Sequence, residues 1–365
     1  MKVPFVILSK YYQAYKEEID RAFQNIMEGG NYVLGQEVIR FESNIADFCG
    51  SRNAISCANG LDAIYLALEA MGVGRGDEVI VPANTYIATW IAVSRLGAIP
   101  VPCEPKPDTY NIDESRLERL ITDKTKAIVP VDLYGRPCDL DCITEIADTH
   151  SLKVIVDAAQ SFGAKYKGKV AGTGADAIAF SFYPTKPLGA IGDGGCVVIT
   201  DKEMADRIRM FRNYGSSTKY VNKYIGINSR LDELQAALLN VKLKHFHEID
   251  RARHAVAEFY NEFITNPDVL KPIADGDARS SWHLYVIRTK RRNELQTWLK
   301  EKGIDTIIHY PVPPHLQEAY SFLGFPKGSF PISEQMANEV LSLPIDSFIS
   351  SDQMDFVASS INEFK

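Results

Sequence analysis

Short apolar runs alternate with helical patterns between Arg52 and about Asp201. Each run is short and bounded by Gly, Pro or polar residues, which is typical of a strand buried on both faces. Alternation of strands and helices favours a parallel sheet with helices on its faces. The pattern therefore predicts an α/β fold with a mostly parallel seven-stranded sheet, whose strands are Asn53–Ala58, Glu78–Pro82, Ile99–Cys103, Ala127–Val131, Val154–Val156, Ala177–Phe182 and Cys196–Ile199.

The segments around this region carry apolar residues at helical intervals. Helices are predicted over Tyr11–Gly29, Gln36–Cys49, Lys202–Tyr214, Leu231–Asp250 and Arg251–Ile264, with a polar loop before Ser229. Beyond residue 250 the pattern predicts a strand at Trp282–Ile287, a helix at Arg292–Lys302, a Pro-rich segment at Tyr310–Pro314 and a last helix from Ser333. We therefore expect a large domain over residues 1–250, with an N-terminal helical segment, and a smaller C-terminal α+β domain over residues 251–365.

Composition narrows the class of protein. The chain has 365 residues, 45% of them hydrophobic and 24% charged, as in ordinary globular enzymes. A net charge of −7 argues against a nucleic-acid partner. The sequence shows no signal-peptide pattern and no apolar run long enough to span a membrane. Its scattered cysteines do not form a zinc pattern, so we expect no metal and a cytoplasmic location.

One stretch, Ala177–Gly195, combines an apolar strand with the loop Tyr183-Pro184-Thr185-Lys186-Pro187 and a glycine-rich turn. Functional groups of α/β proteins lie beyond the carboxyl ends of strands, which is where Lys186 is expected. The alternative is a solvated surface lysine. The glycines follow Lys186 and lead into a strand, so neither a dinucleotide loop nor a P-loop fits.

Two further strand ends support a catalytic role for Lys186. Asp157 directly follows a buried run and needs a cationic partner, for which the pyridine nitrogen of pyridoxal phosphate qualifies; the alternative is a helix cap. Gly60 lies where a strand turns into a helix, a place that suits phosphate but is also found in ordinary turns. Ser181 adds a hydroxyl group beside it. Together, Asp157 and Lys186 indicate pyridoxal phosphate chemistry.

Six motifs, in this order and spacing, resemble one family. They are GLDAI (60–64), VDAAQSFGA (156–164), SFYPTKPLGAIGDGG (181–195), GINSRLDELQAALL (226–239), IIHYPVPPH (307–315) and LSLP (341–344). With them the chain resembles the DegT/DnrJ/EryC1/StrS family of nucleotide-sugar aminotransferases, which are pyridoxal phosphate enzymes of fold type I. The resemblance covers nearly the whole chain.

The resemblance implies a role for several residues at the cofactor. Lys186 matches the lysine that bonds to pyridoxal phosphate, Asp157 the partner of the pyridine nitrogen, and Gln160 the residue beside the phenolic oxygen. Tyr86 matches the aromatic residue that stacks on the ring. The positions that match the phosphate cradle are Gly60, Leu61 and Ser181.

The resemblance also implies a homodimer with shared active sites. Asn228 matches an asparagine that reaches the phosphate of the other subunit. Tyr183 and His309 match positions that face the sugar, His309 from the partner subunit. Candidates for binding the nucleotide diphosphate are, by position alone, Arg212, Lys219 and Arg230, which are at least as well explained as surface charges or dimer contacts.

Three positions depart from the common pattern of the family. Leu61 stands where many members have Thr, so the phosphate must rely on backbone donors. Asp132 stands where many have His, which leaves the role of this position open. Pro187 replaces a common Asn and should stiffen the loop.

The resemblance therefore implies transamination of a nucleotide-linked keto sugar with L-glutamate as the amino donor. We expect the sugar to be a dTDP-linked 3-oxo-6-deoxyhexose, in deoxyamino sugar biosynthesis such as that of lipopolysaccharide O-antigen. The alternative is amination of a 4-oxo-6-deoxyhexose, and a remote alternative is a non-catalytic regulatory relative.

Overall fold

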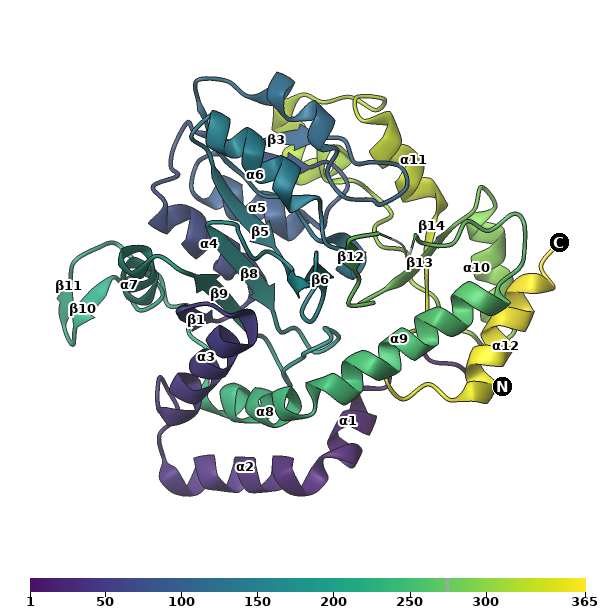
Figure 1. The fold of residues 1–365 in the computed structure, drawn as a ribbon, viewed down its shortest axis with the longest axis horizontal. Coiled ribbons are helices and arrows are strands. Elements are labelled where there is room, and N and C mark those ends of the chain that lie inside the picture. Colours follow the sequence, from purple (N-terminus) through teal and green to yellow (C-terminus); the bar gives the residue numbers. More distant parts are fainter. Residues whose placement is uncertain (274–275) are drawn as a thin grey trace.

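Seven strands form the central sheet of the computed structural model, which describes residues 1–273 and 276–365. Their order is β1-β9-β8-β5-β4-β2-β3 (Figure 1). The four inner pairings from β8 to β3 are parallel, whereas β9 runs antiparallel to both neighbours. The predicted seven-stranded, mostly parallel sheet is confirmed, with strands β1 (Asn53–Cys57), β2 (Glu78–Pro82), β3 (Ile99–Cys103), β4 (Thr125–Ile128), β5 (Lys153–Asp157), β8 (Ala177–Ser181) and β9 (Gly195–Ile199).

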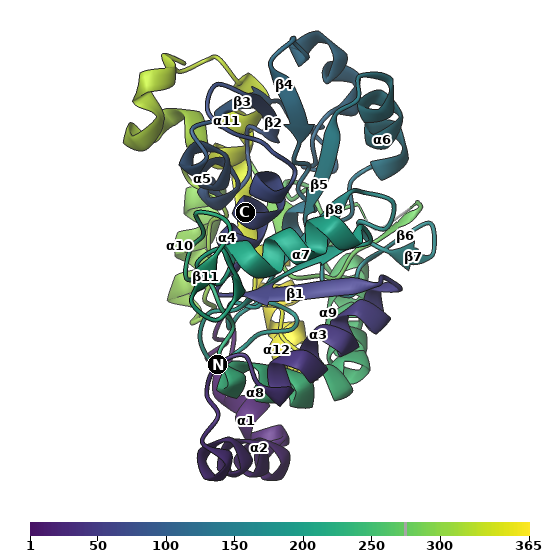
Figure 2. The same ribbon diagram turned by 90° about the vertical axis from the view of Figure 1, so that its left-hand side faces the viewer.

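Helices cover both faces of the sheet, so the strands are buried on both sides and read as continuous apolar runs. One apolar layer joins the sheet to α3 (Gln36–Cys49), α6 (Leu140–Thr149) and α8 (Glu233–Lys244). The opposite layer joins it to α4 (Gly60–Ala70), α5 (Ile87–Arg95) and α7 (Lys202–Phe211). Figure 2 shows α7 and α3 on opposite sides of β1.

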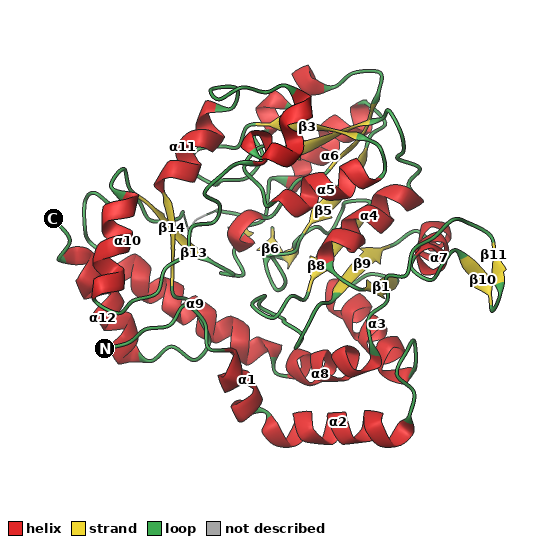
Figure 3. Cartoon of the chain, turned by 180° about the vertical axis from the view of Figure 1, so that it is seen from behind, coloured by secondary structure: helices red, strands yellow, loops and turns green. Residues whose placement is uncertain are grey.

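The C-terminal part has a separate core. Its buried apolar residues include Tyr260, Tyr285 and Leu299. The antiparallel pair β13 (Tyr285–Arg288) and β14 (Val340–Leu343) packs among four helices: α9 (Phe246–Phe263), α10 (Arg292–Glu301), α11 (Pro331–Glu339) and α12 (Ser351–Asn362). Figure 3 shows this part beside the sheet domain, with α9 running between the two.

Some elements differ from the sequence-based predictions. The first predicted helix breaks at Tyr15 into α1 (Leu8–Ala14) and α2 (Lys16–Gly29), and the later long helix breaks at His245. The last predicted helix is two helices separated by β14. Short polar strands have little apolar alternation and gave no signal; these are β6 (Lys165–Tyr166), β7 (Lys169–Val170), β10 (Ser216–Thr218), β11 (Val221–Asn222) and β12 (Ala278–Arg279). Single 3-10 turns lie at Glu114–Arg116, Glu118–Leu120, Leu133–Gly135, Pro314–Leu316 and Glu318–Leu323.

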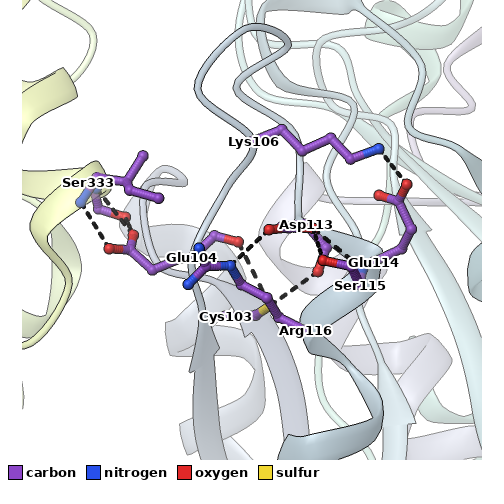
Figure 4. A network of polar contacts seen from close by, with 9 residues as sticks. Cys103, Glu104, Lys106, Asp113, Glu114, Ser115, Arg116 and Ser333 are labelled. Atoms are coloured by element: carbon purple, nitrogen blue, oxygen red, sulfur yellow. Dashed lines mark hydrogen bonds and ion pairs between the residues drawn. The ribbon is translucent and has the colours of Figure 1, made fainter.

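Many contacts cross the predicted boundary at residue 250, and two of them lie at the ends of elements. Val3 pairs with Ile304, so the N-terminal residues lie against the C-terminal part. The buried carboxylate of Glu104 accepts hydrogen bonds from Ile332 N (2.8 Å), Ser333 N (3.0 Å) and Ser333 Oγ (2.6 Å) (Figure 4). A carboxylate satisfies the free N–H groups at a helix N-terminus, so Glu104 ties α11 to the end of β3. The division at residue 250 stays a prediction.

No helix in the described part of the chain is both long enough and apolar enough to cross a membrane.

Candidate active site

A cavity of about 610 Å³ opens at the carboxyl ends of the parallel strands. β5 ends at Asp157 and the adjacent β8 ends at Ser181, so both side chains reach the same edge of the sheet. The cavity wall brings together nine of the residues predicted from the sequence: Gly60, Leu61, Tyr86, Asp157, Gln160, Ser181, Tyr183, Lys186 and His309.

Asp157 is a buried carboxylate whose partners in the protein are neutral. Thr89 Oγ1 donates to one oxygen (2.8 Å) and Ala159 N to the other (3.1 Å). Burial raises the pKa of this carboxyl group, while these hydrogen bonds and the charge of Lys186 lower it. Among the described residues no lysine or arginine forms an ion pair with Asp157, and the cavity is open beside it. A cation bound in the cavity, such as a pyridinium nitrogen, would supply the missing partner.

Lys186 lies in the loop of residues 182–194 that connects the antiparallel strands β8 and β9. Its backbone N–H donates to the carbonyl of Tyr183 (2.8 Å). The buried Lys242 on α8 donates through Nζ to the carbonyl of Gly189 (2.5 Å) and so fixes the far side of this loop. Burial lowers the pKa of Lys186 to about 8, although the charge of Asp157 opposes the shift. About a tenth of Lys186 is therefore a neutral, nucleophilic amine at pH 7, far more than for an ordinary lysine with a pKa of about 10.4.

The start of α4 forms a cradle for an anion. Gly60 and Leu61 are the first residues of the helix, whose first-turn N–H groups lack partners within it. Asn59 caps the helix by accepting from Asp62 N (2.8 Å). A Cβ atom on Gly60 would lie 2.5 Å from Ser181 Cβ. Only glycine therefore allows the first turn of α4 to approach the end of β8 so closely. The cradle suits a phosphate group.

Another part of the wall is aromatic and amide in character. Tyr86 is half exposed, and its ring centroid lies 5.1 Å from that of Tyr310. Gln160 accepts from Tyr134 N through Oε1 (2.6 Å) and donates through Nε2 to Tyr310 Oη (3.1 Å). Both ends of the Gln160 amide are thus fixed, and the Tyr86 ring is free to cover a planar ligand.

His309 lies in the cavity of its own chain, beside Lys186. The expectation that it reaches the site from a partner subunit is therefore wrong for this cavity, because the segment around residue 309 returns from the C-terminal part to the sheet edge. Burial, followed by the charge of Lys186, lowers the pKa of His309 to about 4, and its Nδ1 lies 2.8 Å from Ser342 Oγ. Tyr183 is half exposed at the same wall.

The predicted diphosphate cations lie outside this cavity. Arg212 is buried, pairs with Glu42 and donates to the carbonyl of Ser56 (2.5 Å). We correct the role of Arg212 from ligand binding to structural, because its guanidinium group is buried and its Nη1 already binds Glu42 and the carbonyl of Ser56. Arg230 donates to Asn213 (3.0 Å), and Lys219 lies on the exposed β10–β11 hairpin. Their roles stay proposals.

Asn228 is exposed, and no hydrogen bond of its side chain is seen within the described part of the chain. It also lies outside the cavity that contains Lys186. This placement fits a residue that serves another subunit, so its role also stays a proposal.

Asp132, whose role the sequence left open, lies behind the wall. Its carboxylate accepts from Cys138 N (2.9 Å) and Ser161 Oγ (2.8 Å). Burial raises its pKa to about 6, while these two hydrogen bonds oppose the shift. Asp132 therefore holds two loops together and does not face a ligand.

Sequence reasoning missed several residues of this site. His283 and Tyr310 both line the cavity. Tyr310 directly follows His309, which the sequence did predict. His283 lies in a stretch of alternating apolar residues, and that pattern indicated only a strand. Thr89 and Lys242 gave no signal, because each acts through a contact that the local sequence does not reveal.

The fold and the cavity fit pyridoxal phosphate. A lysine of lowered pKa, a buried carboxylate that lacks a cation and a cradle for phosphate share one cavity at the sheet edge. These features define a pyridoxal phosphate-dependent enzyme of fold type I, the class that includes many transaminases.

Comparison with known proteins identifies the particular family. Residues 13–362 match the DegT/DnrJ/EryC1/StrS aminotransferase family, and the chain belongs to it. It is an aminotransferase whose cofactor is pyridoxal phosphate.

Three similar proteins illustrate the family. The chain is 48% identical, over 99% of both chains, to the dTDP-3-amino-3,6-dideoxy-alpha-D-galactopyranose transaminase of Aneurinibacillus thermoaerophilus. It is 47% identical, over 99% of both, to the erythromycin biosynthesis sensory transduction protein EryC1 of Saccharopolyspora erythraea. The crystal structure of DesV of S. venezuelae superposes with a TM-score of 0.98 at 45% identity and covers 99% of this chain and 98% of that one.

Proposed function

We propose that this enzyme transfers an amino group from L-glutamate to carbon 3 of a dTDP-linked 3-oxo-6-deoxyhexose. The observation that carries the proposal is the placement of Lys186 and Asp157 in one cavity, on a chain 48% identical to a transaminase named for a dTDP-linked 3-amino-3,6-dideoxy sugar. Such a product would serve glycan assembly, for example of lipopolysaccharide O-antigen.

The residues of the cavity have distinct tasks in this reaction. When bound, pyridoxal phosphate supplies an electron sink through its ring. Asp157 stabilises the protonated ring nitrogen, and the α4 cradle with Ser181 holds the phosphate group. Lys186 Nζ takes the proton from the α-carbon of the amino donor and, in the second half of the reaction, moves a proton at the sugar carbon. The pKa of about 8 leaves Lys186 able to work in both directions.

The proposal includes a homodimer with shared sites in the cytoplasm. The segment around the β10–β11 hairpin projects from the body (Figure 1) and exposes apolar side chains. Tyr220 is 88% exposed and Ile225 95%, which is costly unless another surface covers them. Asn228 follows this segment and would reach the phosphate cradle of the partner. Sedimentation of the purified protein would test this, because a monomer at micromolar concentration contradicts the proposal.

A non-catalytic regulatory role is the competing interpretation, and it is worth testing because EryC1 is named a sensory transduction protein. The intact Lys186 and Asp157 support catalysis instead. Bleaching of the cofactor colour by glutamate is the result expected of a transaminase, and persistent colour would favour regulation.

The deciding experiment supplies the enzyme with glutamate and, separately, dTDP-3-oxo-6-deoxyhexose or dTDP-4-oxo-6-deoxyhexose. NMR locates the new amine. An amine on carbon 3 supports the proposal, whereas an amine on carbon 4 leaves Lys186 and the cofactor in their roles but contradicts the proposed substrate.

A further inference from the structure

A histidine outside the family motifs lies in the cavity wall. His283 is 7% exposed and lines the same cavity as Lys186 and His309. Its Nδ1 is fully enclosed and has no hydrogen-bond partner within the described part of the chain. Buried polar atoms without partners are rare in folded proteins, so this ring needs an explanation.

The enclosed nitrogen indicates the tautomer of His283. A neutral imidazole carries one N–H donor and one lone pair. An enclosed N–H without an acceptor is the rarer and costlier arrangement, so we assign the lone pair to Nδ1 and the proton to Nε2. Nε2 is not among the buried atoms that lack a partner, and it makes no hydrogen bond within the described residues, so it reaches the cavity surface. The structure therefore places an uncharged N–H donor at the cavity.

The backbone holds His283 in this position. The preceding residue, Trp282, has φ +49°, a left-handed conformation that is strained for a bulky side chain. Ser281 Oγ donates to the carbonyl of Gln160 (2.7 Å), and this bond joins the His283 segment to the loop that carries Gln160. Arg253 Nη1 donates to the carbonyls of Trp282 (3.1 Å) and His283 (3.3 Å). Strain retained by this many contacts is typical of functional positions.

The charged and titratable groups that act on His283 come from three different elements. They are Lys186 from the β8–β9 connection, Arg253 from α9 and His309 from the segment before the 3-10 helix Pro314–Leu316. Burial first, and these three groups next, lower the pKa of His283 well below its usual value. No carboxylate pairs with Arg253 among the described residues, and the hydrogen bonds that its side chain makes there go to backbone carbonyls. Arg253, joined by Lys186 while that amine is protonated, thus creates a positive potential around a neutral donor, which suits an anionic group.

We propose that His283 Nε2 donates a hydrogen bond to the α-carboxylate of the amino-acid donor. The inference rests on the proposed function, in which Lys186 takes the proton from the α-carbon of that donor. The α-carboxylate is bonded to the same carbon and must lie close to Lys186, where His283 forms the wall. Arg95, the other cationic residue of the cavity wall, is already paired with Asp62 (2.7 Å).

The proposal predicts different effects on the two substrates, because the keto sugar has no carboxylate at its reacting carbon. His283 should therefore matter to the amino-acid half-reaction and not to the sugar half-reaction. A role in folding or in orienting Lys186 would affect both halves.

The test uses His283→Phe, which keeps a ring of similar size and removes both nitrogens, and His283→Gln, which restores an N–H donor. His247→Phe, on the exposed face of α9, is the matched control. Single-turnover absorbance follows the cofactor-loaded enzyme with glutamate and, separately, its aminated form with the keto sugar. Calorimetry measures the binding of glutarate, which has both carboxylates but no amine and needs no turnover.

For His283→Phe we expect kcat/KM for glutamate and the affinity for glutarate to fall about 10- to 100-fold, the usual effect of losing a hydrogen bond to a charged group. The sugar half-reaction should stay within about twofold, since no contact is lost there. His283→Gln should recover part of the loss. Equal slowing of both halves, or unchanged glutarate binding, would overturn the proposal.

Failure of the proposed function gives a different result. A wild-type enzyme that aminates neither sugar contradicts the function, while glutarate binding still decides the role of His283. If His283→Phe does not load cofactor, His283→Leu replaces it, and wild-type glutarate affinity in that variant overturns the proposal.

Discussion

The contact between Gly60 and Ser181 allows one prediction to be worked out in detail. In Gly60→Ala the new Cβ atom would lie 2.5 Å from Ser181 Cβ and 3.2 Å from Ser181 Cα. Carbon atoms normally approach to about 3.5–4.0 Å, so the two elements must separate by about 1 Å or more. Rotation of the serine side chain gives no relief, because its Cβ moves with the backbone.

The cost falls on both stability and cofactor affinity. Forcing one extra methyl group into a packed position costs about 1–3 kcal/mol. The shift also moves the free N–H groups of the first turn of α4 away from the phosphate position. Loss of one charge-assisted hydrogen bond there costs about 1.5–3 kcal/mol, or about 10- to 100-fold in the dissociation constant for pyridoxal phosphate.

Equilibrium dialysis measures the cofactor affinity, and thermal unfolding of the cofactor-free protein measures the stability. Gly74→Ala is the control, because its Cβ atom would meet nothing within 4 Å and its φ is not positive. The double variant Gly60→Ala, Ser181→Gly removes the 2.5 Å contact but leaves the 3.2 Å approach to the backbone Cα at position 181, so it should recover part of the stability. Wild-type affinity in Gly60→Ala would refute the geometry of the cradle.

Three other predictions follow from the site. Burial raises the pKa of Asp132 to about 6, so the native protein loses stability as pH rises from about 4 to 6. Asp132→Asn removes this loss and should stabilise the protein at pH 7 by about 2 kcal/mol more than at pH 4. Chemical unfolding at both pH values measures the difference, and an unchanged pH profile contradicts the prediction. Lys242→Met should keep wild-type secondary structure but lower kcat at least tenfold, because the carbonyl of Gly189 in the Lys186 loop loses its hydrogen-bond donor. Stopped-flow absorbance measures kcat, and an unchanged value would show that Lys186 does not need this contact. Mixing Asn228→Ala protein with Lys186→Ala protein should give mixed dimers that each contain one intact site and have up to half of the wild-type activity per dimer. Activity no greater than the sum of the two separate variants would contradict shared sites.

The sheet and part of the site could be predicted because their signals are local. Buried strands are continuous apolar runs, and all seven predicted strands overlap observed ones. Asp157 directly follows one such run, Ser181 lies near the end of another and Lys186 follows a few residues later, so strand position alone brought them to one edge of the sheet.

The other contacts depend on residues far apart in the sequence. Arg212 looked free in the sequence, but its partner Glu42 lies 170 positions away. Strand patterns in the C-terminal part did not reveal which side chain would face the cavity, so His283 was missed and His309 was assigned to the wrong subunit. Side-chain contacts between distant segments leave no periodic pattern, and only the folded structure shows them.

The cavity wall also constrains how this protein is made in the cell. Its residues come from segments as far apart as Asn59 and Tyr310, and Arg253, which holds the His283 segment, lies between them in the chain. A ribosome adds about 5–20 residues per second, so the chain spends many seconds with its sheet complete but one side of the site not yet synthesised. During that interval Lys186 and Asp157 are open to solvent, and free pyridoxal phosphate can reach them without passing a finished pocket. Folding of the last quarter of the chain over the site would then be the step that encloses the bound cofactor.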